Sequence, residues 1–343
     1  MNWMQRMDWS VARPSRRVPV APLLLVAVLC LGAWFLVERR LAAGTSAYYL
    51  EATTAARQMQ NAMNVIYREK ERLGILQDPA HDPNRTGLIG PEISPLLTTL
   101  GQLQSKRTAT NPDLAAAITA ELLQNGVTQG SPVIVVLSGS FVGANVAVLA
   151  ALETVQAEPF IINSVGGSMY GAIDPQFTWL DMQQALEESG VVRAWPGVAI
   201  PGGYDAIGVG LDEEGMDLIR ESAERTGETL LMAESLGELV DEVIERLESR
   251  SGAPIQPVML INVGGSMLGL GNCTAIELPE ELVTRRPVPC EGGEPGLVTI
   301  LSNDGVPVMN VLNMRFLALQ LGLPYDPIPL PTPGNNPRVY GWR

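Results

Sequence analysis

Three segments rich in glycine and serine directly follow apolar runs of the chain, and their residue types suit the binding of an anionic group. Glycine lets a ligand approach backbone N–H groups closely, and serine adds a hydroxyl that donates or accepts a hydrogen bond. The same glycines could instead serve only to let strands turn tightly into helices. The candidate ligand-binding residues in these turns are Ser138, Gly139, Ser140, Gly166, Gly167, Ser168, Gly264, Gly265 and Ser266.

The second and third turns share the pattern V-G-G-S-M-x-G, which begins at Val165 and again at Val263. Either the chain contains a diverged duplication, or two similar turns face one site. Neither a P-loop nor the G-x-G-x-x-G fingerprint of dinucleotide binding occurs here, so we expect no cofactor. Taken as a set, the three turns favour one pocket for an anion or a carboxylate.

Enzymatic chemistry is harder to assign. Ser138 and Ser140 follow a predicted strand and precede a predicted helix, as a nucleophilic serine does in α/β hydrolases, but the G-x-S-x-G pattern is absent. The single histidine, His81, lies in a predicted loop. No catalytic residue is therefore identified, and the sequence leaves open whether the protein is an enzyme.

Metal binding is not indicated, because the chain contains one histidine and no C-x-x-C pair. Carboxylates near the predicted strand ends lack any spacing specific to Mg²⁺, so we expect no metal site. Cys273 and Cys290 flank a loop rich in proline, glutamate and glycine. If the domain lies outside the cytoplasm, these two cysteines should form a disulfide.

The chain has a formal net charge of −14, with 23 basic and 37 acidic residues. Such an acidic chain disfavours nonspecific binding to nucleic acid, and we expect no nucleic-acid partner. Basic residues are scarce enough for a pair to be informative. Lys106 and Arg107 precede the first predicted βα unit, and we count both as candidate ligands for an anion at the pocket mouth.

The element pattern predicts the fold. Apolar runs at 132–137, 159–163, 257–262 and 297–302 read as strands, with a further strand within 191–200. Helical patterns lie between them and at 309–321, and an amphipathic helix is predicted within 45–73. Alternating strands and helices imply an α/β fold, a mostly parallel Rossmann-like three-layer sandwich, which would follow one N-terminal transmembrane helix.

That transmembrane helix is predicted from an apolar run of about 20 uncharged residues, Val18–Val37. A cleaved signal peptide is the alternative, but Glu38, Arg39 and Arg40 directly after the run favour a retained anchor. The lipid bilayer is thus an expected partner. The predicted organisation is a basic arm (1–17), a transmembrane anchor (18–40), a membrane-proximal helix and loop (41–110), an α/β domain (111–323) and a Pro-rich tail (324–343).

Parts of the domain resemble a known family. The segment TGLIGPEISPLLTTLGQLQSKRTATNPDLAAAI (86–118), together with VVLSGSFVGAN, DPQFTWLDM and the VGGSM turns, is similar to the poly-gamma-glutamate system protein family. The resemblance covers roughly residues 45–320. It implies a membrane-anchored component of poly-γ-glutamate synthesis or export that binds an anionic glutamyl ligand or the synthase complex. The alternative is a hydrolase or transferase that acts on γ-glutamyl amide bonds with a serine at a strand end.

The arginine bias around the apolar run makes the topology testable. Four arginines precede the run and two follow it, so we expect a cell-membrane protein with a cytoplasmic N-terminus and an extracytoplasmic domain. Protease added to intact spheroplasts should then digest the domain, as followed by immunoblot. A domain that is protected until the cells are lysed would place it on the cytoplasmic side.

Overall fold

The computed structural model describes residues 20–41, 46–75, 78–251 and 256–341. The chain forms two compact units, one of residues 1–44 with 342–343 and one of Thr45–Gly341. The second unit therefore includes residues 45–110 of the segment predicted at 41–110, and residues 324–341 of the tail predicted at 324–343. The bounds predicted for the domains remain predictions.

The described part of the first unit is one helix, α1 (Val20–Leu41), whose leucines between residues 23 and 36 are exposed. Among the residues that the structure describes, no helix meets the length and apolar character of a membrane span. The basic arm at 1–17 lies outside the described residues. The anchor predicted at 18–40 begins outside them too, and it stays a prediction.

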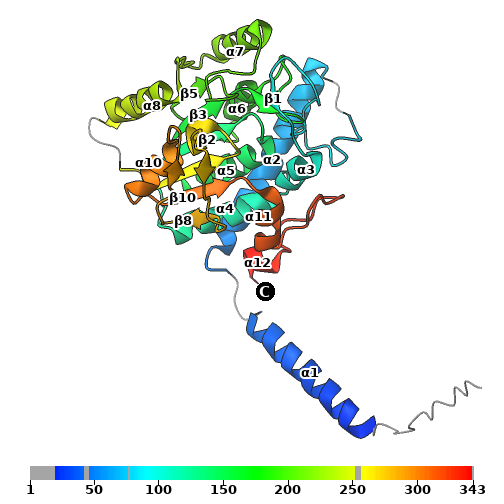
Figure 1. The fold of residues 1–343 in the computed structure, drawn as a ribbon. Helices are drawn as coiled ribbons and strands as arrows, with labels where there is room; N and C mark the ends of the chain where they lie inside the picture. Colours follow the sequence, from blue (N-terminus) through cyan, green and yellow to red (C-terminus); the bar gives the residue numbers. More distant parts are fainter. Residues whose placement is uncertain (1–19, 42–45, 76–77, 252–255, 342–343) are drawn as a thin grey trace, which may run out of the picture. The chain divides into compact units, whose positions relative to one another are not determined.

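The second unit is built around a six-stranded sheet (Figure 1). All adjacent strands pair in parallel except β8, which runs antiparallel to β10 at one edge. The strands in sheet order are β5 (Gly197–Ile200), β3 (Glu158–Ser164), β2 (Pro132–Ser138), β6 (Met259–Val263), β10 (Val308–Val311) and β8 (Val283–Thr284). The mixed α/β class and the mostly parallel sheet are as the sequence predicts, and the arrangement is compatible with a Rossmann-like sandwich.

Short pairs of strands and a set of helices surround this sheet. Two two-stranded ladders join β1 (Leu97–Thr99) to β4 (Gly167–Ser168) and β7 (Ala275–Ile276) to β9 (Cys290–Glu291). The described helices are α2 (Tyr49–Leu73), α3 (Leu103–Ala109), α4 (Asp113–Gln124), α5 (Val142–Val155), α6 (Trp179–Glu188), α7 (Glu213–Thr226), α8 (Leu236–Ser251), α9 (Met267–Leu270), α10 (Leu297–Asn303), α11 (Met314–Leu321) and α12 (Pro337–Tyr340).

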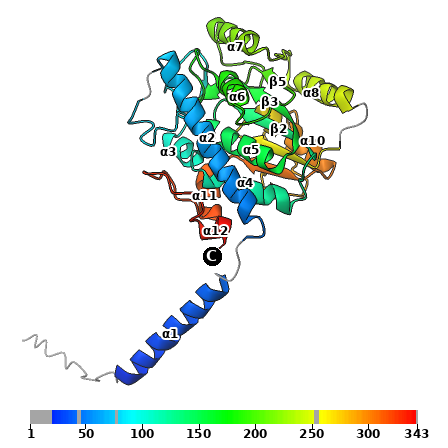
Figure 2. The same cartoon turned by 180° about the vertical axis from the view of Figure 1, so that it is seen from behind.

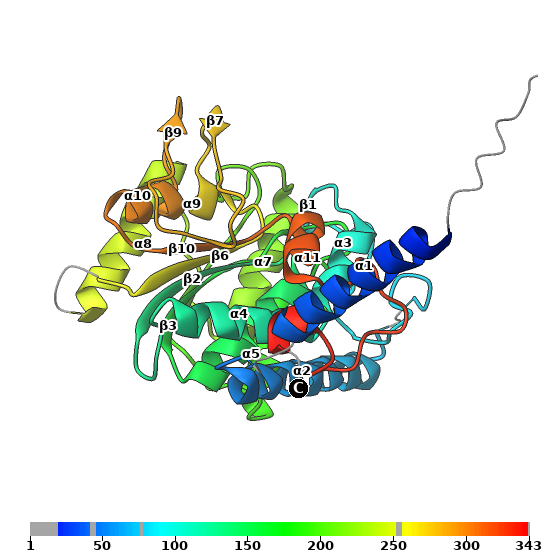
Figure 3. The same ribbon diagram turned by 90° about the horizontal axis from the view of Figure 1, so that it is seen from below.

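The central strands are apolar on both faces because helices cover both. Along β2, Val133 and Val135 enter one hydrophobic cluster, whereas Ile134 and Val136 enter another. The period-2 geometry of a strand requires this alternation. The first cluster packs against α4 and α5, and the second against α8 and α10. Figure 3 shows these helices on opposite sides of the sheet, and Figure 2 shows α2 running across the outside of α4 and α5.

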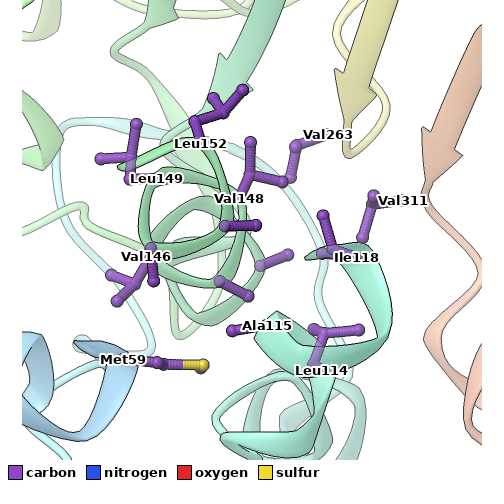
Figure 4. Packing of buried hydrophobic residues seen from close by; sticks show 14 of the residues in the cluster. Met59, Leu114, Ala115, Ile118, Val146, Val148, Leu149, Leu152, Val263 and Val311 are labelled. Carbon is purple, nitrogen blue, oxygen red and sulfur yellow. The ribbon is translucent and has the colours of Figure 1, made fainter. Parts of the chain in front are cut away.

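Small residues let α2 lie close to α4 and α5. Ala52, Ala55 and Ala62 recur at helical spacing and are fully or almost fully buried. Met59 points from the same face toward α4 and α5, near Ala115 (Figure 4). The amphipathic helix predicted within 45–73 is confirmed by α2, which ends at Gly74 in the left-handed conformation typical of a helix C-terminus.

Two predicted elements are corrected by the structure. The run 297–302 forms a helix, α10, because a short apolar run fits a buried helix as well as a strand. Its expected place in the sheet is taken by β10, which pairs with β6. The predicted helix at 309–321 accordingly starts later, at Met314, where Asn313 Oδ1 accepts the N–H of Phe316 at 3.2 Å.

The C-terminal segment is held to the unit by a buried tyrosine. Tyr340, at the end of α12, has no exposed surface, and its hydroxyl donates to Asp113 Oδ1 of α4 at 2.6 Å. Its ring also meets Tyr49 of α2 edge to face, with the ring centroids 5.9 Å apart. Burial raises the pKa of the Asp113 carboxyl, while the bond from Tyr340 works in the opposite direction. Loss of this hydroxyl would therefore leave a buried carboxyl group with one hydrogen-bond donor fewer, since the backbone of Gly334 also contacts Asp113.

We expect Tyr340→Phe to lower the free energy of unfolding by about 1–3 kcal/mol, because the buried Asp113 loses the hydrogen bond from the tyrosine hydroxyl. Tyr340→Ala should cost about 3–5 kcal/mol, since it also leaves a cavity. Urea denaturation of the detergent-solubilised chain, followed by circular dichroism, measures both values. The exposed Tyr204 supplies a control, because Tyr204→Phe should change stability by less than about 0.5 kcal/mol. Equal values for all three variants would contradict this role of Tyr340.

Candidate functional site

The strand order reverses direction at β2. From β2 the chain moves outward through β3 to β5, and it then returns to the other side of β2 to form β6 and β10. In open α/β sheets, ligands bind in the crevice at the carboxyl ends of strands at such a switch point. The turns after β2, β3 and β6 meet there around a cavity of about 510 Å³. We call this space the switch-point cavity.

Most of the predicted ligand-binding residues line this cavity. The lining ones are Ser138, Ser140, Gly166, Ser168, Gly264, Gly265, Ser266 and Lys106. All three turns therefore lie at the same edge of one sheet, as expected from parallel strands. Three predicted residues, Gly139, Gly167 and Arg107, are not among the lining residues.

Gly139 and Gly167 instead let the first two turns pack together. A Cβ atom on Gly139 would lie 2.3 Å from the carbonyl oxygen of Val165, and one on Gly167 would lie 2.8 Å from the carbonyl carbon of Gly139. Cβ atoms essentially never lie this close to other non-bonded atoms, so a side chain at either position would force the neighbouring backbone to shift. These two glycines therefore have a packing role, and their contact with a ligand stays a prediction.

Arg107 does not line the cavity either, and its contact with an anion stays a prediction. Its guanidinium pairs with Asp326, with both nitrogen–oxygen distances at 2.5 Å, and Nη1 donates to the carbonyl oxygen of Ala80 at 3.3 Å. This ion pair ties α3 to the C-terminal segment. Because adjacent residues on a helix point about 100° apart, Lys106 faces the cavity while Arg107 cannot.

Lys106 is the one charged side chain among the residues that line the cavity. It is 7% exposed, and its Nζ donates to the carbonyl oxygen of Ser140 and lies 2.7 Å from Ser168 Oγ. The ammonium also lies 5.1 Å from the ring centroid of Phe141, a cation–π distance. Burial lowers the pKa of Lys106 to about 8. At neutral pH, the cavity thus holds one cation that gains or loses its proton within the physiological range.

A chain of serine contacts organises the wall around Lys106. The N–H of Ser140 donates to Ser138 Oγ at 3.2 Å, and the N–H of Ser168 donates to Ser140 Oγ at 2.9 Å. Ser140 therefore contacts both partners of the Lys106–Ser168 pair. On the third turn, Ser266 is 8% exposed and its Oγ has no hydrogen-bond partner among the described residues. An unsatisfied buried hydroxyl in a cavity wall is a group that a ligand can bind.

Sequence reasoning missed one side of the cavity. The segment 98–102 reaches it because β1 pairs with β4, which places Thr99 opposite Ser168. Tyr204 arrives from the glycine-rich loop between β5 and α7. Neither segment shows helical or strand periodicity. The loop around Tyr204 is marked by its glycines, whereas the segment 98–102 carries no comparable signal in the sequence.

Cys273 and Cys290 form a disulfide, with their Cα atoms 5.3 Å apart. Cys290 begins β9, and Cys273 lies two residues before β7, the strand that pairs with β9. The disulfide therefore reinforces this short two-stranded ladder. The pairing is the one expected for an exported domain, and export itself stays a prediction. In the described part of the chain, no group of three or more metal-ligating side chains occurs.

No protein-family model matches this chain, and neither the curated proteins nor the solved structures contain a match to it. The resemblance to the poly-gamma-glutamate system family therefore rests on the sequence segments alone. Function has to be argued from the site, because one fold hosts many activities.

The glycine contacts predict which positions tolerate a side chain. Gly139→Ala and Gly167→Ala should each destabilise the domain by about 1–3 kcal/mol or more, because the added methyl overlaps backbone atoms. Gly265→Ala should fold normally, since its Cβ would meet only Leu312 Cδ1 at 3.9 Å. Thermal unfolding of the three variants tests this order. A Gly265→Ala protein as unstable as the other two would contradict it.

Proposed function

We propose that the protein is a membrane-anchored component of poly-γ-glutamate synthesis or export whose switch-point cavity binds an anionic glutamyl ligand. The observation that carries the binding proposal is the composition of the cavity wall, where one lysine is surrounded by serine hydroxyls and glycine turns. An acidic chain that keeps a single cation at the crevice of its sheet can attract an anion there and repel it elsewhere. The synthase or export complex is the second proposed partner.

The chemistry of a glutamyl unit matches this wall. Each unit carries one carboxylate and one amide, so it needs a cation and several neutral hydrogen-bond partners. Lys106 supplies the cation, and Ser266 Oγ supplies a hydroxyl without a partner in the described structure. A cavity of about 510 Å³ falls within the range typical of small-molecule sites, which is enough for a short segment of polymer or a precursor.

The membrane location is proposed on the sequence alone. The uncharged run Val18–Val37 is about the length of a transmembrane helix, and the arginine bias favours an exported domain. A disulfide between Cys273 and Cys290 supports an oxidising location, where such bonds persist. An anchored domain outside the membrane would meet the polymer where it leaves the cell.

We expect Lys106→Gln to weaken binding of poly-γ-glutamate at least tenfold, because a charged hydrogen bond contributes about 1.5–3 kcal/mol. Binding of wild-type protein should also weaken as the pH rises through about 8, since Lys106 then loses its proton. Titration calorimetry of the detergent-solubilised chain with short poly-γ-glutamate measures both effects. The same variant should reduce polymer production in cells.

Arg107→Gln provides the matched control, because it removes the same charge from the neighbouring position of α3 while leaving the cavity wall intact. Its stability should be measured alongside, since it breaks the ion pair with Asp326. Equal affinity of wild type and Lys106→Gln, or equal losses in both variants, would overturn the cavity as the binding site.

A further inference from the structure

Lysine is rare in this chain, and both lysines are buried. The sequence contains Lys70 and Lys106 and otherwise uses arginine for its side-chain cations. Lys70 is 2% exposed and donates to the carbonyl oxygen of Ile89 at 3.2 Å, so its role is structural. Lys106 is the lysine that faces a cavity. Arginine stays protonated in proteins, whereas a buried lysine can release its proton and accept one back.

The contacts of Lys106 also allow its neutral amine to act on Ser168. A neutral amine has two N–H donors and one lone pair. It can donate to the carbonyl oxygen of Ser140 and accept the proton of Ser168 Oγ, whose distance to Nζ is 2.7 Å. The hydroxyls of Ser138 and Ser140 each accept a backbone N–H. Among these three cavity serines, only Ser168 has its hydroxyl in contact with the amine.

The backbone also holds Ser168 firmly. Its N–H is bound by Ser140 Oγ, and the next N–H, of Met169, donates to the carbonyl oxygen of Thr99 at 3.1 Å. The following residue, Tyr170, has a φ of 65°, a conformation that costs energy for a residue other than glycine. A serine fixed on both sides and hydrogen-bonded to a titratable amine matches the arrangement of an activated nucleophile.

We propose that Ser168 and Lys106 form a nucleophile–base pair that cleaves or transfers the acyl group of an acidic amide bound in the switch-point cavity. This inference rests on the proposed function in one respect: the acyl group is a γ-glutamyl group only if the cavity binds the glutamyl ligand proposed above. Serine–lysine pairs are a known variant of the serine–histidine arrangement. Ser140 is a positioning residue, because it contacts both members of the pair.

The proposed reaction needs only one co-reactant, which is water for hydrolysis or a second amine for acyl transfer. Ser168 Oγ attacks the amide carbonyl carbon while Lys106 Nζ accepts the hydroxyl proton. The C–N bond then breaks, and Lys106 gives the proton to the leaving nitrogen. The resulting acyl ester on Ser168 is attacked by water for hydrolysis, or by an amine for transfer. Lys106 accepts the proton of the attacking group and returns it to Ser168 Oγ, which restores the pair.

Binding and turnover depend on opposite protonation states of Lys106. The ammonium attracts the acidic ligand, and the neutral amine activates Ser168. With a pKa of about 8, roughly a tenth of the protein has the neutral amine at pH 7. KM should therefore rise with pH while kcat rises as well, and the bound anion should move the pKa seen in kcat upward.

The test uses the full chain in detergent, with γ-glutamyl-p-nitroanilide as the chromogenic substrate and short poly-γ-glutamate for binding. Wild type should release p-nitroaniline, with kcat increasing from pH 6 to 9. Ser168→Ala and Lys106→Arg should each lower kcat by about 10²–10⁴-fold, since each removes one half of the pair. Both should still bind poly-γ-glutamate, Lys106→Arg because it keeps the positive charge.

Ser249→Ala supplies the matched control, because Ser249 is an exposed serine of α8 that does not line the cavity. Two further measurements use the wild-type protein, so they do not require the larger arginine of Lys106→Arg to fit the cavity wall. A fluorophosphonate probe should modify Ser168 in wild type, as mapped by mass spectrometry. Competitive acetylation should show Lys106 gaining reactivity near pH 8, since burial lowers its pKa to about 8.

The outcomes separate the two proposals. Retained binding with no p-nitroaniline release by wild type would overturn the nucleophile–base pair and leave the binding site standing. Normal turnover by a folded Ser168→Ala protein would do the same. Lys106→Gln should lose both polymer binding and p-nitroaniline release. Lys106→Arg should keep polymer binding and lose release. These two results together support the binding site and the nucleophile–base pair. Absence of polymer binding and of release in wild type would overturn both.

Discussion

The burial of Lys106 is the constraint on which the site depends. An amine removed from water is costly unless hydrogen bonds replace its hydration, and here the replacements come from Ser140 and Ser168. These serines follow two different strands, so the lysine joins α3 to the turns after β2 and β3. The docking of α3 in turn needs Gly143 of α5, where a Cβ would lie 2.7 Å from the backbone of Ala109. One side chain thus couples the helix layer to the carboxyl edge of the sheet.

The switch-point cavity places a positive charge at the carboxyl edge of the sheet in an otherwise acidic protein. The chain is strongly acidic, and the wall of the switch-point cavity includes one cation and no carboxylate. A low-dielectric wall concentrates the field of that cation, which favours an anion in the cavity over one on the surrounding surface. The same burial lowers the pKa of the amine to about 8, so affinity for anions and capacity for proton transfer have one physical origin.

The sequence predicts a helix or a strand correctly where the spacing of apolar residues and the length of the apolar segment both point to the same element. The runs leading to β2, β3 and β6 were recognised because they are apolar on both faces and are followed by turn formers, and α2 was recognised by its buried alanine stripe. The run 297–302 was misjudged because six apolar residues suit a strand and a helix equally. The pairing of β6 with β10 determines that residues 308–311, and not 297–302, form the strand next to β6. Pairing between distant segments leaves no local signal in the sequence.

By itself, the sequence determined that three glycine–serine turns follow apolar strands of a mostly parallel sheet, and that few cations are available to meet them. Parallel strands place their carboxyl ends at one edge, so the convergence followed from the strand pattern alone. Only the tertiary structure decided that Lys106 enters the cavity while Arg107 pairs with Asp326. It also decided that Gly139 and Gly167 pack against backbone whereas Ser168 meets an amine. Those outcomes depend on the direction in which a side chain leaves its helix and on contacts between segments up to 219 residues apart, which no spacing in the sequence encodes.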